Sequence, residues 1–348
     1  MRFLVLIVIS VWANLSFAAG ECGGPLGLLQ GPGTVQSRSI SFNGASRSYS
    51  YFTPRAVPDN SPLIVLLHPY GSTGTLFSNY VDIPQIGHEK CAIVIAPSGR
   101  SLAWNAGNVN TGSNADDVNF IMAAIADYKS RNLNKVDSDR QYLMGMSNGG
   151  SMAYRMACER SASFAGMVIV AGALPRDVEG RIKTEPGFDP AYACDNAADP
   201  SKPSHPIPLF VIHGKEDACL NFNGGPLAAP NADVLIPSVN KVATEWAGFN
   251  GCPVTEIAAG TLTLTLQTSR PSLGELSCRE ISGCSNGSNV KVCNIERGGH
   301  RWPGASALTS FVTCGGDGGL ASKSDFFATR EAFEYLLTNN FRLSQLLN

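Results

Sequence analysis

The sequence predicts an α/β fold with a mostly parallel, doubly wound sheet, because short apolar runs alternate with helical patterns along the chain. Continuous apolar runs are typical of strands that are covered on both faces, and they occur at 63–67, 92–96, 141–144, 167–171 and 208–212. The clearest helical pattern covers 116–128, which begins with two aspartates and then repeats apolar residues at helical spacing. Strands that alternate with helices are the pattern of a sheet with helices on both faces.

The first segment, 1–18, is predicted to be a signal peptide. A single basic residue precedes an apolar core that is too short to span a bilayer, and Ser16, Phe17 and Ala18 form a cleavage site of the small-x-small kind. Asn14 interrupts the apolar run, which argues against an anchor helix. We therefore expect a protein that is secreted or periplasmic and has no stable membrane anchor.

The mature chain, 19–348, is expected to be one domain that opens with an antiparallel hairpin. Alternating residues at 38–42 and 47–52 flank Asn43-Gly44, a dipeptide typical of hairpin turns. No internal repeat, charge run or Ser/Thr-rich linker marks a second module. The segment 177–206, rich in Pro, Asp and Ala, is interpreted as an insertion or lid over the sheet.

Ten cysteines favour disulfides in an exported chain, since they lack the C-x-x-C pairs of a zinc site. Their spacing does not determine the pairing, and Cys91 and Cys158, which lie in apolar segments, are left open as buried free thiols. The ten are Cys22, Cys91, Cys158, Cys194, Cys219, Cys252, Cys278, Cys284, Cys293 and Cys314.

The charge balance argues against two classes of partner. The net charge is -2 and 16% of the residues are charged, so the chain has no electrostatic footprint for nucleic acid or for an anionic membrane. With 44% hydrophobic residues it is expected to bury a substantial core. The oligomeric state is left open.

The candidate nucleophile is Ser147, in Gly145-Met-Ser-Asn-Gly149, which joins an apolar run to a helical pattern. A serine on a sharp strand-to-helix turn needs glycines two residues away on either side, because side chains there would collide. The helix that follows directs backbone N–H groups at an oxyanion. This arrangement indicates acyl transfer.

A second match to the same pattern, Gly283-Cys-Ser-Asn-Gly287, has a different context. It follows a polar segment and precedes 290–295, which alternates like a strand. It is therefore interpreted as a turn that leads into a strand rather than as a nucleophile elbow.

A catalytic acid and base are expected after the nucleophile, in that order. Asp217 lies just past the carboxyl end of a predicted strand, with Glu216 as its competitor. His300 is the only histidine after Asp217. The other histidines are interpreted as structural, with His213 at a strand end and His88 and His205 in loops.

The oxyanion hole is predicted from two backbone N–H groups. The glycine-rich segment 68–74 follows the first apolar run, and since Pro69 has no N–H, Tyr70 is the expected donor together with Asn148. Trp104 and Trp302 are candidate walls for an acyl or aromatic group of the substrate, with core packing as the alternative.

Several ordered motifs together resemble the secreted esterase family that includes poly(3-hydroxybutyrate) depolymerases and feruloyl and acetylxylan esterases. They lie between 38 and 338, and the most specific are the elbow, His213-Gly-x-x-Asp217 and Gly-Gly-His300-x-Trp-Pro-Gly; the others are Trp104-Asn-Ala-Gly, Asp116-Asp-Val and Ala157-Cys-Glu. The resemblance implies an α/β-hydrolase with Ser147 as nucleophile, Asp217 as acid and His300 as base.

The same resemblance implies a bridge between Cys252 and Cys284. It also reveals two departures. The chain has His68-Pro69 where the family usually has His-Gly, and it carries an additional segment from Cys314 to Gly319.

The expected function is two-step hydrolysis of a carboxylic ester on a polymer or oligomer, without a cofactor or metal. Asp117, Asp177 and Asp195 do not form a metal cluster by spacing. Since no linker to an adsorption module is seen in the sequence, we expect a plant-wall ester or a soluble oligoester rather than a crystalline polyester. The alternatives are a non-catalytic binding protein and a serine peptidase of the same fold.

Asn286-Gly-Ser288 is a glycosylation acceptor if the host modifies exported proteins.

Overall fold

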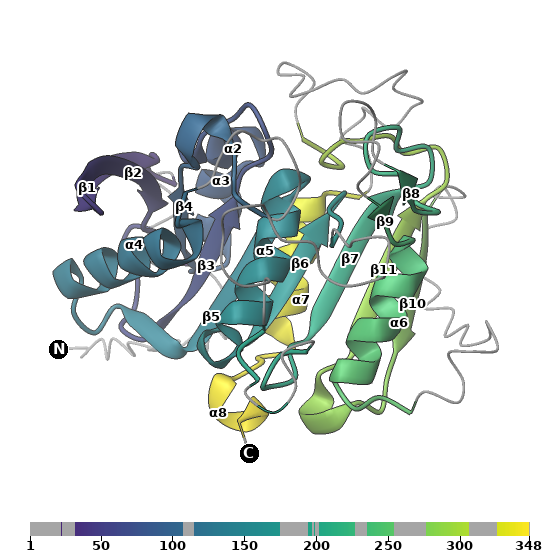
Figure 1. Cartoon of the computed structure of the whole chain (residues 1–348). Helices are drawn as coiled ribbons and strands as arrows, with labels where there is room; N and C mark the ends of the chain where they lie inside the picture. The colour runs from purple at the N-terminus through teal and green to yellow at the C-terminus, as the bar shows by residue number, and fades with distance from the viewer. Residues whose placement is uncertain are drawn as a thin grey trace, which may run out of the picture.

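A nine-stranded mixed sheet forms the centre of the molecule (Figure 1). This computed structural model describes residues 22, 32–106, 115–174, 194–196, 198, 202–226, 235–253, 276–305 and 326–347. The strand order is β1-β2-β4-β3-β5-β6-β7-β11-β10. In chain order the strands are β1 (Gln36–Phe42), β2 (Ala45–Phe52), β3 (Ser61–Leu67), β4 (Ile93–Pro97), β5 (Val136–Met146), β6 (Gly166–Val170), β7 (Leu209–Gly214), β10 (Leu276–Ile281) and β11 (Val290–Ile295).

Six neighbouring strands of the sheet run parallel, in the order β4-β3-β5-β6-β7-β11. The antiparallel strands lie at the two sides of the sheet. β1 pairs with β2 and β2 with β4 on one side, while β10 pairs with β11 on the other. A separate pair, β8 (Gly225–Pro226) with β9 (Leu235–Ile236), stands outside this sheet. The predicted α/β sheet with an N-terminal hairpin is thus confirmed.

Helices cover both faces of the sheet. α4 (Asp117–Arg131), α5 (Asn148–Glu159) and α6 (Val239–Phe249) pack on one face, and in Figure 1 they lie in front of the strands. α2 (Gly74–Tyr80), α3 (Ile83–Glu89) and α7 (Ala328–Thr338) pack on the other face. The short α8 (Leu343–Leu346) contacts β5.

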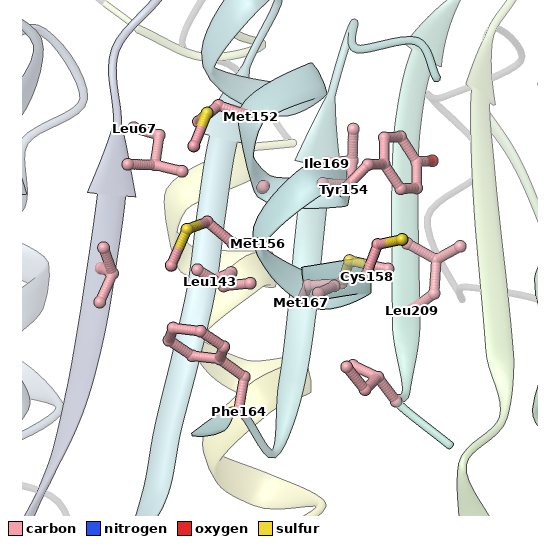
Figure 2. Packing of buried hydrophobic residues seen from close by; sticks show 14 of the residues in the cluster. Leu67, Leu143, Met152, Tyr154, Met156, Cys158, Phe164, Met167, Ile169 and Leu209 are labelled. Carbon is pink, nitrogen blue, oxygen red and sulfur yellow. The ribbon is translucent and has the colours of Figure 1, made fainter. Parts of the chain in front are cut away.

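The central strands bury both of their faces, which explains their continuous apolar runs. In β3, Leu63 and Val65 face one core, whereas Ile64 and Leu66 face the other. Figure 2 shows two methionines of α5 in the first of these cores, with Met152 near Leu67 and Met156 near Leu143. α5 is thereby held against β5, the strand that precedes it, and against the neighbouring strands β3 and β6.

The predicted elements form with small differences in their ends. The helix expected at 116–128 is α4, with the side chain of Asp116 accepting a hydrogen bond from Asn119 N as its N-cap. β5 begins at Val136, before the apolar run at 141–144; the residues 137–140 are polar and at least partly exposed, so the apolar run did not include them. In the hairpin, Asn43 and Gly44 both have positive φ, as a two-residue turn of this kind requires.

Four disulfides join described cysteines. They are Cys22–Cys91, Cys158–Cys194, Cys252–Cys284 and Cys278–Cys293. The reading of Cys91 and Cys158 as free thiols was wrong, since both find partners from polar segments far along the chain. The Cys252–Cys284 bridge is confirmed. Each bridge typically contributes about 2–4 kcal/mol of stability.

Several predictions fall outside the described residues. These are the signal peptide at 1–18, most of the insertion at 177–206, Asp177, and the segment from Cys314 to Gly319. In the described part of the chain, no helix combines the length and the apolarity needed to cross a bilayer.

Candidate active site

Ser147 lies on the turn between β5 and α5, at the carboxyl edge of the sheet. Its backbone has φ 55° and ψ −123°, a conformation that residues other than glycine rarely adopt and that costs about 1–3 kcal/mol. Hydrogen bonds hold it there, because Ser147 N donates to Val170 O at 3.0 Å and Ser151 N donates to Ser147 O at 2.9 Å. These bonds fix the backbone of Ser147 between the end of β5 and the start of α5.

The glycines of the elbow are required by close backbone contacts. A Cβ on Gly145 would lie 2.3 Å from Gly149 O, and a Cβ on Gly149 would lie 2.1 Å from Leu67 O. Real Cβ atoms do not approach backbone atoms so closely. The steric interpretation of the glycine spacing is confirmed.

The structure brings Ser147, His300 and Asp217 into one chain of hydrogen bonds. His300 Nε2 lies 2.8 Å from Ser147 Oγ, and His300 Nδ1 lies 2.7 Å from Asp217 Oδ2. Asp217 and His300 are buried, whereas Glu216, the competing acid, is exposed. With Asp217 as acceptor, Nδ1 carries the proton and Nε2 is left to accept one from the serine.

Asp217 is fixed by its own loop as well as by His300. Its Oδ1 accepts hydrogen bonds of 2.8 Å from both Cys219 N and Leu220 N. Burial raises the pKa of Asp217, but hydrogen bonds from His213 and His300 outweigh burial and hold the pKa of this carboxyl well below its usual range. The carboxylate is therefore ionised next to the imidazole over the whole range in which the protein is expected to work.

His213 has a contact that the sequence analysis missed. It ends β7 as expected, yet its Nε2 also lies 2.8 Å from Leu220 O and 3.3 Å from Asp217 Oδ2. The signal was the spacing of four residues between His213 and Asp217 across a strand end. His213 therefore closes the loop that carries the acid.

The base lies on a loop after β11 that is packed against the end of β7. A Cβ on Gly214 would lie 2.1 Å from Gly298 O, so glycine at this position allows the two segments to touch. Glu216 N also donates to Gly298 O at 2.9 Å. These contacts place His300 beside Asp217 although they are far apart in sequence.

The expected oxyanion donors, Tyr70 and Asn148, lie at the ends of neighbouring elements. Asn148 is the first residue of α5, where backbone N–H groups have no acceptor within the helix. Tyr70 follows β3, and its side chain is 48% exposed. On either side of it, His68 Nδ1 donates to Pro69 O at 2.8 Å and Gly71 N donates to Leu102 O at 2.8 Å. Pro69 is thus accommodated in an ordered loop.

Trp104 and Trp302 occupy packing positions, which differs from their expected role as walls of the substrate site. Both are almost fully buried, with exposures of 0% and 2%. Trp104 Nε1 donates to His68 O, and Trp302 Nε1 donates to Thr329 Oγ1, each at 2.9 Å. An indole that packs on all sides has no face left for a ligand.

His68 is predicted to make the stability of the protein depend on pH. Burial lowers its pKa from 6.5 to about 4. The unfolded chain then binds more protons between these values, so stability is full above pH 6.5 and decreases as the pH falls to about 4, by about 3 kcal/mol. Thermal unfolding of wild type and His68→Gln from pH 7 to pH 4 tests this prediction. If the stability of His68→Gln decreased with falling pH as steeply as that of the wild type, the prediction would be contradicted.

One group of ligand-type atoms occurs at this site. Among the described residues, Asp217, Cys219 and His300 have such atoms within 4.8 Å of one another. Cys219 is disulfide-bonded, however, so it supplies no thiolate for a metal. We assign no metal to these residues.

The sheet, the elbow and the Ser-His-Asp geometry at the carboxyl edge define an α/β-hydrolase. No protein-family model matches the chain. A probable feruloyl esterase C of Aspergillus clavatus is 30% identical over 237 residues, which are 63% of this chain and 75% of that protein. The putative esterase NocK of Nocardia uniformis subsp. tsuyamanensis is 27% identical over 287 residues, 78% of this chain and 75% of that protein.

Among solved structures, the acetyl xylan esterase from Aspergillus awamori has a TM-score of 0.51 at 15% identity, covering 76% of this chain and 94% of that one. This likeness concerns the fold. The sequence relatives show the family: the chain belongs to the esterase family that includes the feruloyl esterases. It is a carboxylic ester hydrolase.

Proposed function

We propose that this esterase uses Ser147, His300 and Asp217 as a catalytic triad on carboxylic esters of polymeric or oligomeric substrates. The observation that carries the proposal is the continuous chain of hydrogen bonds from Ser147 Oγ through His300 to Asp217 Oδ2, of 2.8 Å and 2.7 Å. A nucleophile, a base and an orienting acid within such distances are the requirement for acyl transfer.

In the proposed mechanism, Ser147 Oγ attacks the ester carbonyl while His300 Nε2 takes its proton. The alcohol then leaves with that proton, and the acyl group remains on Ser147. Water attacks the acyl-enzyme with His300 again as base, which releases the acid and restores the serine. Asp217 stabilises the imidazolium in both steps.

The backbone N–H groups of Tyr70 and Asn148 are proposed to bind the oxyanion of each tetrahedral intermediate. Their location supports this role, because Tyr70 follows β3, Asn148 starts α5, and β3 is the neighbour of β5, the strand that leads into Ser147. Loss of one such donor typically costs about 2.7–4 kcal/mol in the transition state. No residue is assigned to bind the leaving alcohol.

Feruloyl esters are the substrate class that we propose. Relatives named feruloyl esterase recur among the matches, including feruloyl esterase D of Neurospora crassa, 25% identical over 318 residues that cover 86% of this chain and 88% of that protein. We also propose that 1–18 is a cleaved signal peptide and that the exported enzyme is one domain. Four disulfides support an oxidising compartment.

Purified mature protein is expected to release ferulic acid from methyl ferulate faster than it releases hydroxybutyrate from a poly(3-hydroxybutyrate) suspension. Both products are measured by chromatography, with Ser147→Ala as the control for contaminating activity. Faster release of hydroxybutyrate would contradict the feruloyl proposal and favour a depolymerase. Hydrolysis of a peptide amide with no ester hydrolysis would contradict the proposed reaction itself.

A further inference from the structure

The two proposed oxyanion donors lie on separate segments, and one short segment is bonded to both of them. Tyr70 belongs to the loop after β3, whereas Asn148 belongs to the elbow. Residues 99–104, which we call the bridging segment, follow β4 and contain the short helical turn η1 (Arg100–Leu102). This segment has no role in the chemistry described above.

One side of the bridging segment holds the loop of Tyr70. Gly99 N donates to His68 Nε2 at 2.9 Å, and Leu102 O accepts from Gly71 N at 2.8 Å. Trp104 Nε1 donates to His68 O at 2.9 Å. The residues on both sides of Pro69-Tyr70 are therefore fixed by this one segment.

Its other side holds the elbow through Trp104. Trp104 N donates to Asn148 Oδ1 at 2.7 Å, and Asn148 Nδ2 donates back to Trp104 O at 3.1 Å. All four atoms are buried. The indole ring also packs on His68, with 4.8 Å between the ring centroids. Trp104 thus contacts the segment of one donor with its side chain and that of the other with its backbone.

The bridging segment is held in a strained form. Ser101 and Leu102 are consecutive residues with φ of 55° and 62°. A Cβ on Gly99 would lie 2.2 Å from Ala103 O, so the turn closes tightly on itself. Strain of this kind persists only when the surrounding contacts determine the conformation, and it concentrates at functional sites.

We propose that Trp104 is a positioning residue that sets the distance between the Tyr70 and Asn148 N–H groups. This inference rests on the proposed function. Oxyanion donors act only when they lie about 2.7–3.1 Å from the oxyanion, and a displacement of about 1 Å can reduce the rate about 100-fold. A substrate wall would change binding, whereas a positioning residue changes the chemical step.

Trp104→Phe tests the proposal, with Trp246→Phe as a matched control. Trp246 is 2% exposed, and its Nε1 donates to Ile207 O at 2.9 Å, so each variant keeps an aromatic ring and loses one indole bond to a carbonyl. We expect kcat of Trp104→Phe on a p-nitrophenyl ester to fall about 10- to 100-fold with KM within about twofold. The control is expected to keep the wild-type kcat with a similar loss of melting temperature.

A second readout uses a trifluoromethyl ketone, whose tetrahedral adduct with serine mimics the oxyanion. Its inhibition constant is expected to rise in Trp104→Phe by the same factor as the loss of kcat, and to stay unchanged in Trp246→Phe. Equal kcat values for the two variants would overturn the positioning role, and a raised KM with normal kcat would make Trp104 a binding residue. An inactive wild type would instead contradict the proposed function.

Discussion

Replacing Ser147 by alanine is expected to lower kcat on a p-nitrophenyl ester by about a million-fold. Without the hydroxyl no acyl-enzyme forms, and His300 has no nucleophile to deprotonate. What remains is binding and any oxyanion stabilisation of direct attack by water, which accounts for a small residual rate. The assay is steady-state release of p-nitrophenol. Labelling with a fluorophosphonate, followed by mass spectrometry of the labelled peptide, identifies the nucleophile directly.

Ser285→Ala is the matched control, because Ser285 lies in the second Gly-x-Ser-x-Gly match. It starts the turn η4 (Ser285–Gly287) between β10 and β11 and is exposed, with its backbone N donating to Asn250 O. This variant should retain the wild-type rate and label. An active Ser147→Ala, or an inactive Ser285→Ala of normal stability, would contradict the assignment of the nucleophile.

Asp217→Asn is expected to reduce kcat by about ten-thousand-fold. An amide can donate a hydrogen bond to the imidazole, which would leave the proton on Nε2 and prevent it from accepting the proton of Ser147. The amide also lacks the charge that stabilises the imidazolium. Because the hydrogen bonds from His213 and His300 hold the pKa of Asp217 well below its usual range, this negative charge is present over the whole pH range of the assay.

Glu216→Gln is the control for this prediction, because it changes the neighbouring carboxylate in the same way. Glu216 is exposed, and its backbone N donates to Gly298 O in the loop of the base, a bond that the substitution retains. It should therefore leave kcat unchanged. Equal losses in the two variants, with melting temperatures close to wild type, would show that the acid had been misassigned.

The central sheet could be predicted from the sequence because burial on both faces leaves an unbroken apolar signal. That signal fails where a strand carries polar, partly exposed residues, as β5 does at 137–140. It also failed for the cysteines. Cys91 and Cys158 have apolar neighbours, but a partner across the fold is a property of tertiary distance, which local composition does not report.

For the site, the three residues of the proposed triad could be predicted from the sequence, but the residues around them could not. The order and strand-end positions of Ser147, Asp217 and His300 are local properties, and the structure brings the three side chains into hydrogen-bond contact. The surroundings of Trp104 were not predictable. From the sequence, a tryptophan in a loop is equally compatible with a wall of the substrate site and with a buried packing residue. The contacts of Trp104 with His68 and Asn148 distinguish these roles.

Synthesis of the chain from its N-terminus produces Ser147 first, Asp217 next and His300 last. Ser147 follows β5, Asp217 follows β7, and His300 follows β11, which completes the parallel part of the sheet beyond β7. A chain that is still being synthesised can thus form the turn that carries Ser147 before it contains His300. With the triad proposed above, ester cleavage begins only after β11 and the loop that follows it have been made and folded, so an incomplete chain that ends before His300 is expected to be inactive.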